Sequence, residues 1–542
     1  MKSNLTKYIA LLAIVVASQP AWSQKKFFSR QDTLRGTITA ERAWWDLVYY
    51  DLQLIPDIRE KTLKGQNTIV YKPIADGNVM QIDLQPPMQV DKVLQEGKEL
   101  SFTRDGNVYL ITVTNSSKST NAVTVYFSGK PRVSPNPPWS GGLTWKKDAN
   151  GLPFVATSCQ GDGASLWWPC KDHAYDEPDS MQISITTSKA LTAVANGRLR
   201  ATTKTDTTAT YTWFVSNPIN NYGVNMNIAS YVHISEKYAG KNGTLDCDYY
   251  VLPYNLAKAK KQFAQVKLML DAFEDRFGPY PFYADGYKLV EVPYLGMEHQ
   301  SSVTYGNGYQ NGYLGKDLSG TGQGDLFDFI IIHESGHEWF ANSITCKDIA
   351  DMWIHEGFTC YSESVYLEYH HGLEAAYEYL RGLRGNIAND RPIIGAYGVN
   401  NQGSSDMYFK GANMLHTLRQ WVNDDKVWIN LLRDINTTFY HQTVTTQQIE
   451  GFIAEKTGKN LTAFFNQYLR DKRVPAFEYK VEGNSFKYRW ANCIETFDMP
   501  LKVSIGGVEK WIYPTTKWTT DKTVSDVIEV DPDFYITTAI VE

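Results

Sequence analysis

The 542-residue sequence lacks several features that would point to particular classes of protein. It has no basic run and no stripe of basic and aromatic residues, and with a net charge of −6 this argues against nucleic acid as a partner. No stretch beyond the N-terminal region approaches the roughly 18 apolar residues that a membrane-spanning helix needs. There are only six cysteines, none in a C-x-x-C pair, and whether they are free thiols or partly paired stays open.

The one marked apolar run lies at the N-terminus and is typical of a secretory signal. Two lysines accompany residues 8–17, an apolar stretch that is too short to cross a bilayer. Ala21 and Ser23 place small residues just before a cleavage point, so we predict cleavage before Gln24. Residues 1–23 are then a signal peptide, and the mature protein is exported, periplasmic or extracellular, without a stable membrane span. An uncleaved anchor is the alternative.

Residue patterns divide the remaining chain into three predicted domains, which makes the fold class multidomain α+β. Residues 24–237 mix β-branched and aromatic residues with turn clusters, which predicts an antiparallel β-sandwich or saddle. Residues 238–473 are dominated by the apolar spacing of helices. The helical pattern breaks at Pro475, and residues 474–542 predict a small C-terminal β-sandwich.

A segment rich in glycine, proline and tryptophan, residues 157–178, interrupts the first domain. Its composition predicts a loop rather than a strand. Long irregular segments in compact domains are often functional, but an ordinary ordered loop explains this composition equally well.

Residues 331–340 contain an H-E-x-x-H pattern formed by His333, Glu334 and His337. Residues four apart lie on one face of a helix, so both imidazoles can bind one Zn²⁺ with Glu334 beside it to handle a proton. The same pattern also arises by chance in helices that bind no metal. A catalytic zinc takes three protein ligands and leaves one position for water, so a third ligand is needed.

The residues that follow distinguish between classes of zinc site. Phe340 and Ser343 stand where a metzincin would need glycine and histidine, which excludes that class. Eighteen residues separate His337 from Glu356, which leaves room for the first helix to end and a second to begin. Two imidazoles and one carboxylate form the His₂Glu set of catalytic zinc peptidases.

This arrangement resembles that of the gluzincin aminopeptidases of the membrane alanyl aminopeptidase type. Their pattern is H-E-x-x-H, eighteen residues and then the glutamate of W-L-N-E-G-F, which here reads WIHEGF at residues 353–358. Four further family motifs have counterparts in order along the chain, and the resemblance covers residues 45–475. These are WPCKD at 168–172, FGPYP at 277–281, LGMEH at 295–299 and YFKG at 408–411.

The resemblance implies a mainly helical, thermolysin-like catalytic domain with one Zn²⁺ per chain, held by His333, His337 and Glu356. It implies that Glu334 is the general base toward a zinc-activated water and that Tyr408 donates a hydrogen bond to the oxyanion.

The substrate-binding residues that the resemblance implies are Gln160, Gly296, Met297 and Glu298. Gln160 and Glu298 correspond to residues that hold the free α-amine of a peptide, which implies peptide substrates with a free N-terminus.

Several positions depart from the family pattern. Leu295, Gly296 and His299 differ from the family's G-A-M-E-N segment at positions expected to line the first subsite, so the side-chain preference stays open. His355 replaces an asparagine and either tunes the site or faces solvent. Glu363 lies on the same helix face as Glu356, where it either orients a ligand imidazole or is a solvated surface residue.

The chain ends after the predicted small β domain, whereas longer relatives continue into a large helical domain that closes over the active site. We therefore expect either a cleft that is more open to solvent or a second subunit that covers it, and the oligomeric state is unknown.

The predicted function is that of a zinc aminopeptidase. One alternative is the epoxide-hydrolysing branch of the same family, which shares the zinc site. The other is a non-catalytic binding or scaffold protein on the same fold, which would be expected to have lost residues that this chain retains.

Overall fold

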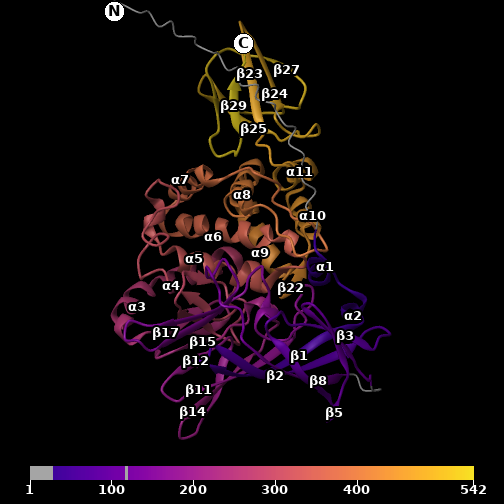
Figure 1. Ribbon diagram of the computed structural model, residues 1–542. Helices are drawn as coiled ribbons and strands as arrows, with labels where there is room; N and C mark the ends of the chain where they lie inside the picture. Colours follow the sequence, from indigo (N-terminus) through magenta and orange to yellow (C-terminus); the bar gives the residue numbers. More distant parts are fainter. Residues whose placement is uncertain (1–27, 116–119, 542) are drawn as a thin grey trace, which may run out of the picture.

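The computed structural model describes residues 28–115 and 120–541, so the predicted signal peptide at 1–23 lies outside the described residues. Three parts follow one another in space as they do along the chain: N-terminal sheets, a helical middle and a small C-terminal group of strands (Figure 1). The predicted multidomain α+β fold class is confirmed. Among the described residues, no helix has the length and apolar character needed to cross a membrane.

The N-terminal part begins with two short helices and continues as three sheets. The helices are α1 (Arg30–Gly36) and α2 (Ala40–Ala43). The largest sheet contains, in spatial order, β13 (Arg198–Lys204), β14 (Thr208–Val215), β11 (Ser180–Ser188), β1 (Trp45–Asp57), β2 (Thr62–Pro73), β8 (Asn121–Gly129), β4 (Gln89–Gln95) and β5 (Lys98–Glu99). A second sheet contains β12 (Thr192–Val194), β15 (Asn227–Ala229), β10 (Pro153–Ser158) and β9 (Gly142–Lys147), and a third β3 (Val79–Asp83), β7 (Val108–Thr112) and β6 (Phe102–Asp105).

One strand pair in the largest sheet departs from the predicted antiparallel arrangement, because β1 and β11 run parallel. Parallel neighbours need a long crossover connection, and here the chain forms β2 to β10, strands of this sheet and of the other two, between the paired strands. In other strands, buried and half-buried side chains alternate, as the prediction of half-buried strands requires. In β14, Tyr211 and Trp213 are buried, whereas Thr210 and Thr212 are only half-buried and contact threonine and serine hydroxyls of β11.

The helical middle is built on a five-stranded sheet. In spatial order this sheet contains β16 (Val232–Gly240), β17 (Gly243–Val251), β18 (Tyr287–Glu291), β20 (Val303–Tyr305) and β19 (Gly296–Met297). It therefore starts at Val232, ahead of the predicted boundary at 238. The helices are α3 (Leu256–Gln262), α4 (Gln265–Phe277), α5 (Phe329–Gly336), α6 (Trp353–His371), α7 (Leu373–Leu383), α8 (Phe409–Val422), α9 (Asp425–Thr438), α10 (Thr446–Thr457) and α11 (Thr462–Arg470), with a strand pair β21 (Ile344–Cys346) and β22 (Gln442–Val444).

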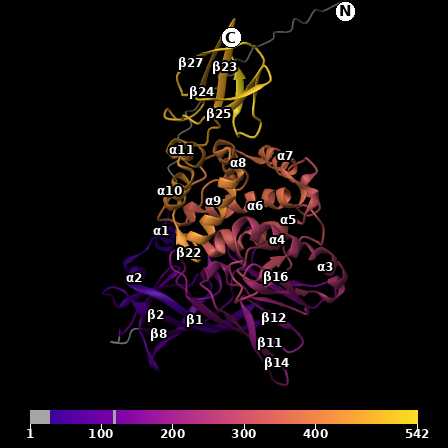
Figure 2. The same cartoon turned by 180° about the vertical axis from the view of Figure 1, so that it is seen from behind.

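The C-terminal strands form two sheets on the far side of the helices from the N-terminal sheets, as both views show (Figures 1 and 2). One sheet contains β27 (Thr519–Lys522), β24 (Ser485–Ala491), β23 (Ala476–Glu482) and β29 (Thr537–Ile540), and the other β26 (Val508–Ile512), β25 (Leu501–Ile505) and β28 (Ile528–Val530). Asp533 fixes this part to the helices, because its carboxylate contacts Arg381 at 2.9 Å and His416 at 3.0 Å.

None of the six cysteines, all of which lie within the described residues, forms a disulfide. Five of them are buried, and Cys493 is half-buried. Of the two readings that the sequence left open, the structure therefore has the free thiols.

Helices α6 and α8 approach one another closely at a pair of glycines. A Cβ atom added at Gly411 of α8 would lie 2.9 Å from the Cα atom of Gly357 in α6. Gly357 directly follows Glu356, and Gly411 lies three residues after Tyr408. The contact between these two glycines therefore sets the distance between Glu356 and Tyr408, two of the predicted site residues.

We predict that Gly411→Ala destabilises the protein although alanine is the better helix former. The gain in helix propensity is about 1 kcal/mol, while forcing a methyl group against packed backbone costs about 1–3 kcal/mol and shifts the helices. Gly451→Ala in α10 is the matched control, because a Cβ atom there meets nothing within 4 Å. Thermal unfolding should show a lower midpoint for Gly411→Ala and an unchanged or higher one for Gly451→Ala. A raised midpoint for Gly411→Ala would contradict the close packing.

Candidate active site

Helix α5, which carries the first predicted ligand, is capped by an aspartate at its start and ends at a glycine. Asp328 caps α5, and its carboxylate accepts hydrogen bonds from the backbone N–H groups of Ile330 and Ile331 at 3.1 and 3.3 Å. Gly336 lets α5 lie close to α6, since a Cβ atom there would be 2.5 Å from Ser362 Oγ. The helix ends at Gly336, and His337 follows as its C-terminal cap. The chain then bends through η5 (Glu338–Ser343) and β21 before α6 begins.

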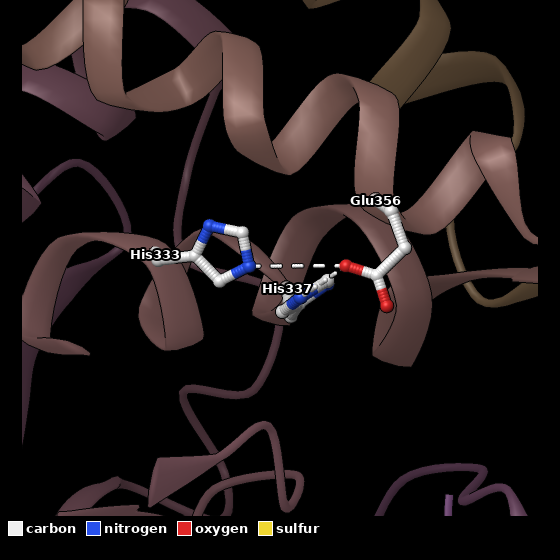
Figure 3. Close-up of side chains that lie close together, drawn as sticks. All are labelled: His333, His337 and Glu356. Atoms are coloured by element: carbon white, nitrogen blue, oxygen red, sulfur yellow. Dashed lines mark ion pairs between the residues drawn. The ribbon is translucent and has the colours of Figure 1, made fainter. Parts of the chain in front are cut away.

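Side chains from α5, from its C-terminal cap and from α6 converge on one point (Figure 3). The Oε2 atom of Glu356 lies 3.3 Å from His337 Nε2 and 3.8 Å from His333 Nε2. All three residues are buried, and their facing atoms lie within 4.8 Å of one another. The structure therefore brings together the three residues predicted to bind a metal: His333 comes from α5, His337 from its C-terminal cap and Glu356 from α6.

The outer nitrogen of each imidazole is held by a neighbour. His333 Nδ1 lies 2.6 Å from Glu363 Oε1, and the second oxygen of Glu363 accepts a hydrogen bond from the Tyr379 hydroxyl at 2.5 Å. His337 Nδ1 lies 3.0 Å from the Phe340 carbonyl oxygen, which can only accept. Both Nδ1 atoms are therefore donors, so that in the neutral form of each ring the lone pair is on Nε2, where a metal can bind. Of the two readings of Glu363, the solvated surface residue is wrong.

The residues present fit a divalent metal ion. Glu356 Oε2 is buried and has no hydrogen-bond partner among the described residues. Burying a carboxylate oxygen without a hydrogen-bond donor costs free energy, and a cation bound by this oxygen and the two Nε2 atoms would offset that cost. Burial raises the pKa of Glu356, but the His337 and His333 imidazoles outweigh burial and hold that pKa low. The carboxylate is therefore charged, as a ligand must be.

A second group of polar side chains lies beside the three. Facing atoms of Glu298, Glu334 and His337 also lie within 4.8 Å of one another. The Gln160 amide nitrogen donates to Glu298 Oε1 at 2.7 Å and to Glu356 Oε1 at 2.9 Å. Carboxylates accept only, so the amide nitrogen must face them, and the amide oxygen stays available as an acceptor. Burial raises the pKa of Glu298, and the Glu356 carboxylate adds to this rise against the opposing effect of His337.

All nine predicted site residues line a single cavity of about 260 Å³. They are Gln160, Gly296, Met297, Glu298, His333, Glu334, His337, Glu356 and Tyr408. The Tyr408 ring stacks beside His333, with ring centroids 6.1 Å apart. Burial raises the pKa of Tyr408 well above its usual value, and the Glu356 and Glu298 carboxylates raise it further, so the hydroxyl stays protonated and can donate. None of the described lining residues comes from the C-terminal strands.

The residues that depart from the family pattern do not all line the cavity. Leu295 and Gly296 line the cavity as expected, but His299 does not, because its ring turns into the interior and contacts Thr304 Oγ1 at 3.2 Å. His355 is also buried, so a solvent-facing role is wrong. Its Nε2 atom accepts a hydrogen bond from the Cys346 backbone N–H at 2.7 Å, and its Nδ1 atom lies 3.5 Å from the Tyr222 hydroxyl.

The sequence did not predict a set of hydrogen bonds that hold the Glu298 segment against the chain that follows α5. Glu338, the residue after His337, is buried and accepts hydrogen bonds from the Ser301 N–H at 2.9 Å and the Tyr280 hydroxyl at 2.8 Å. Asn342 donates to the Glu298 carbonyl oxygen at 2.9 Å. The partners lie far apart in the sequence, so no local pattern could have revealed them. These hydrogen bonds fix the distance between Glu298 and the metal-binding residues.

Comparison with known families supports the same reading. The family model described as "Peptidase family M1 domain" matches residues 262–468, and the one described as "Peptidase M1 N-terminal domain" matches residues 47–222. The two matches together include every one of the nine predicted site residues.

Related proteins and structures are distant in sequence. "Probable aminopeptidase 1" of Sulfurisphaera tokodaii is 19% identical over 456 residues, which are 80% of this chain and 54% of that protein. "Aminopeptidase 2, mitochondrial" of Saccharomyces cerevisiae is 23% identical over 415 residues, 70% of this chain and 41% of that protein. The chain thus spans about half the length of the curated relatives it matches.

Among solved structures, an M1 zinc metallopeptidase from Deinococcus radiodurans has a TM-score of 0.67 and 20% identity. The alignment covers 82% of this chain and 99% of that one. A mutant of an M1 zinc metallopeptidase from the same organism, bound to a Tyr-Ser-Ala substrate, has a TM-score of 0.66 at 20% identity, over 80% of this chain and 96% of that one. At this identity the likeness concerns the fold.

We predict that Glu363→Gln weakens metal binding without unfolding the protein. The substitution removes the charge that holds the Nδ1–H group of His333, and loss of such a partner costs about 10- to 100-fold in metal affinity. Glu374→Gln is the control, because Glu374 is 74% exposed and contacts Arg381 rather than a ligand. Competition with a chelator measures the affinity of each variant for Zn²⁺. Equal affinities for Glu363→Gln and the original protein would contradict the role of this hydrogen bond.

Proposed function

The chain belongs to peptidase family M1, and we propose that it is a zinc-dependent aminopeptidase, which hydrolyses the first peptide bond of peptides with a free N-terminus. His333, His337 and Glu356 are the residues that would hold the Zn²⁺. When bound at such a set, zinc lowers the pKa of a water molecule and polarises a carbonyl group.

One observation carries the choice of an aminopeptidase over other peptidases: the buried Glu298 carboxylate beside the metal-binding group. A facing oxygen of Glu298 lies within 4.8 Å of the facing His337 nitrogen. In a peptide, the α-nitrogen and the carbonyl carbon of the same residue are two bonds apart, about 2.5 Å. An ammonium group held by Glu298 therefore leaves only the first carbonyl group within reach of the metal, so cleavage occurs after the first residue.

The amine site suits a cation and little else. Glu298 supplies a buried carboxylate, and because the Gln160 amide nitrogen donates to it, the amide oxygen of Gln160 stays available as a second acceptor. A charged carboxylate pairs most favourably with a positively charged donor, which the free N-terminus provides. A blocked N-terminus has neither the charge nor the donors, and it leaves Glu298 unpaired in the interior.

The roles of Glu334 and Tyr408 follow from their positions in the cavity. Glu334 shares the space with His337 and Glu298, where it can take a proton from a water molecule and later give it to the leaving amine. Burial raises the pKa of Glu334 above its ordinary value, although His333 opposes that rise, and a carboxylate with a raised pKa can both accept and return a proton. The Tyr408 hydroxyl stays protonated and can donate to the oxygen on which negative charge develops.

We predict that Glu334→Gln keeps zinc but loses nearly all turnover. Glutamine preserves the shape of the side chain but cannot accept a proton, and general-base catalysis contributes about 10²- to 10⁴-fold to such rates. Zinc content and the rate of hydrolysis of a panel of aminoacyl reporter substrates are measured on the same preparation. Turnover within about tenfold of the original protein would contradict the role of Glu334.

We predict that Glu298→Ala lowers kcat/KM for free-amine substrates by about 30-fold or more, since truncating one partner of a buried charge pair costs roughly 2 kcal/mol or more. The loss should appear mainly as a higher KM, because the ammonium group is held in the ground state as well as in the transition state. Steady-state kinetics on aminoacyl reporters measure both constants. An unchanged KM would show that Glu298 does not hold the amine.

A further inference from the structure

The rim of the cavity carries a tryptophan that the proposed chemistry does not use. Trp139 is 62% exposed and, with Pro138, lines the same cavity as the metal-binding residues. A large aromatic ring left more than half in water at the mouth of a site gains apolar burial when a ligand covers it. Tryptophan is also among the residues that contribute most to recognition at binding surfaces.

The segment that carries Trp139 is fixed to the segment that carries Gln160. Asp162 lies two residues after Gln160, and its Oδ2 atom accepts a hydrogen bond from the Gly141 N–H at 2.7 Å. The same oxygen pairs with the Arg132 guanidinium group at 2.6 Å. Arg132 and Gly141 flank Trp139 in the sequence, so both ends of this loop are tied to the side of the cavity where the amine is proposed to bind.

The cavity walls have a clear chemical character. Leu295, Met297 and Phe329 contribute apolar surface. The acidic residues of the lining are Glu298, Glu334, Glu356, Glu363 and Asp406. None of the described lining residues is a lysine or an arginine. Apart from the proposed Zn²⁺, an acidic substrate side chain entering this cavity would meet carboxylates of its own sign and no lysine or arginine among the described lining residues, whereas an apolar side chain would contact apolar surface.

We propose that Trp139 forms one wall of the site for the side chain of the substrate's first residue, and that this site takes bulky apolar or aromatic side chains and rejects acidic ones. This rests on the proposed aminopeptidase function, because an amine held at Gln160 and Glu298 is what places that side chain beside the Trp139 loop. The indole ring then covers the side chain on the face that is otherwise open to solvent.

Steady-state kinetics of the zinc-loaded protein on reporter substrates that differ only in the first residue test this assignment. Trp139→Ala should lower kcat/KM for phenylalanyl and leucyl substrates by about 10- to 100-fold, and by much less for glycyl substrates, which offer no side chain to cover. Trp139→Phe should recover most of the loss. Trp518→Ala is the matched control, because Trp518 is 42% exposed, directly precedes β27 in the C-terminal part and does not line the cavity.

Glutamyl and glutaminyl substrates test the charge part of the proposal, since the two side chains have the same shape. The glutaminyl substrate should be hydrolysed at least about 10-fold more efficiently. A second readout uses the Glu334→Gln variant, in which calorimetry measures the affinity for an intact peptide that begins with phenylalanine. Adding Trp139→Ala to that variant should weaken the affinity, whereas adding Trp518→Ala should not.

The outcomes separate this inference from the function on which it rests. If the protein hydrolyses aminoacyl substrates but Trp139→Ala lowers kcat/KM equally for glycyl and phenylalanyl substrates, or not at all, the Trp139 assignment is overturned and the aminopeptidase stands. Equal hydrolysis of glutamyl and glutaminyl substrates overturns the rejection of acidic side chains. If the zinc-loaded protein hydrolyses no aminoacyl substrate, both proposals are overturned.

Discussion

A buried carboxylate oxygen without a hydrogen-bond donor, Glu356 Oε2, faces two imidazole nitrogens, and the rest of the site depends on this contact. A buried charge in that position needs a cation to compensate it. The site also needs helices that are packed too closely to shift and expose the carboxylate to water. Gly336 brings α5 against α6, and Gly357 with Gly411 brings α6 against α8. The glycines let three helices approach closely enough to hold His333, His337 and Glu356 in place.

The cavity is assembled at the junction of the N-terminal sheets and the helical middle. The Gln160 amide comes from the N-terminal part and donates to both Glu298 and Glu356, so it joins the proposed amine site to the metal-binding group. From the other side, Glu338 and Asn342 tie the Glu298 segment to the chain that follows α5. These contacts fix the separation between amine and metal, and that separation is what makes the proposed enzyme remove single residues.

The predictable part of the site is the part governed by local geometry. The four-residue spacing of His333 and His337 places them on one helix face whatever the rest of the fold does, and the eighteen-residue interval suffices for a turn and a second helix bearing Glu356. Glu298, Gln160 and Tyr408 came only from the family resemblance, because their spacing to the histidines carries no information without the fold.

What could not be predicted depends on contacts between distant segments. Trp139 is one of 15 tryptophans, and nothing in its neighbourhood marks it as lying at the mouth of the cavity. His299 was expected to line the cavity, but it lies in the turn between the antiparallel strands β19 and β20, and its ring contacts Thr304 in the interior. The parallel pairing of β1 with β11 likewise follows from how sheets assemble rather than from either strand's own pattern.

The most direct test of the account compares one peptide in two forms, with its α-amine free and with the same amine acetylated. The zinc-loaded protein is incubated with each, and mass spectrometry follows every product over time. The account predicts that the free peptide loses its first residue and that the acetylated peptide stays intact at every bond, because Glu298 then has no ammonium group to hold. Cleavage of the acetylated peptide at an internal bond, at a rate comparable with that of the free peptide, would contradict it.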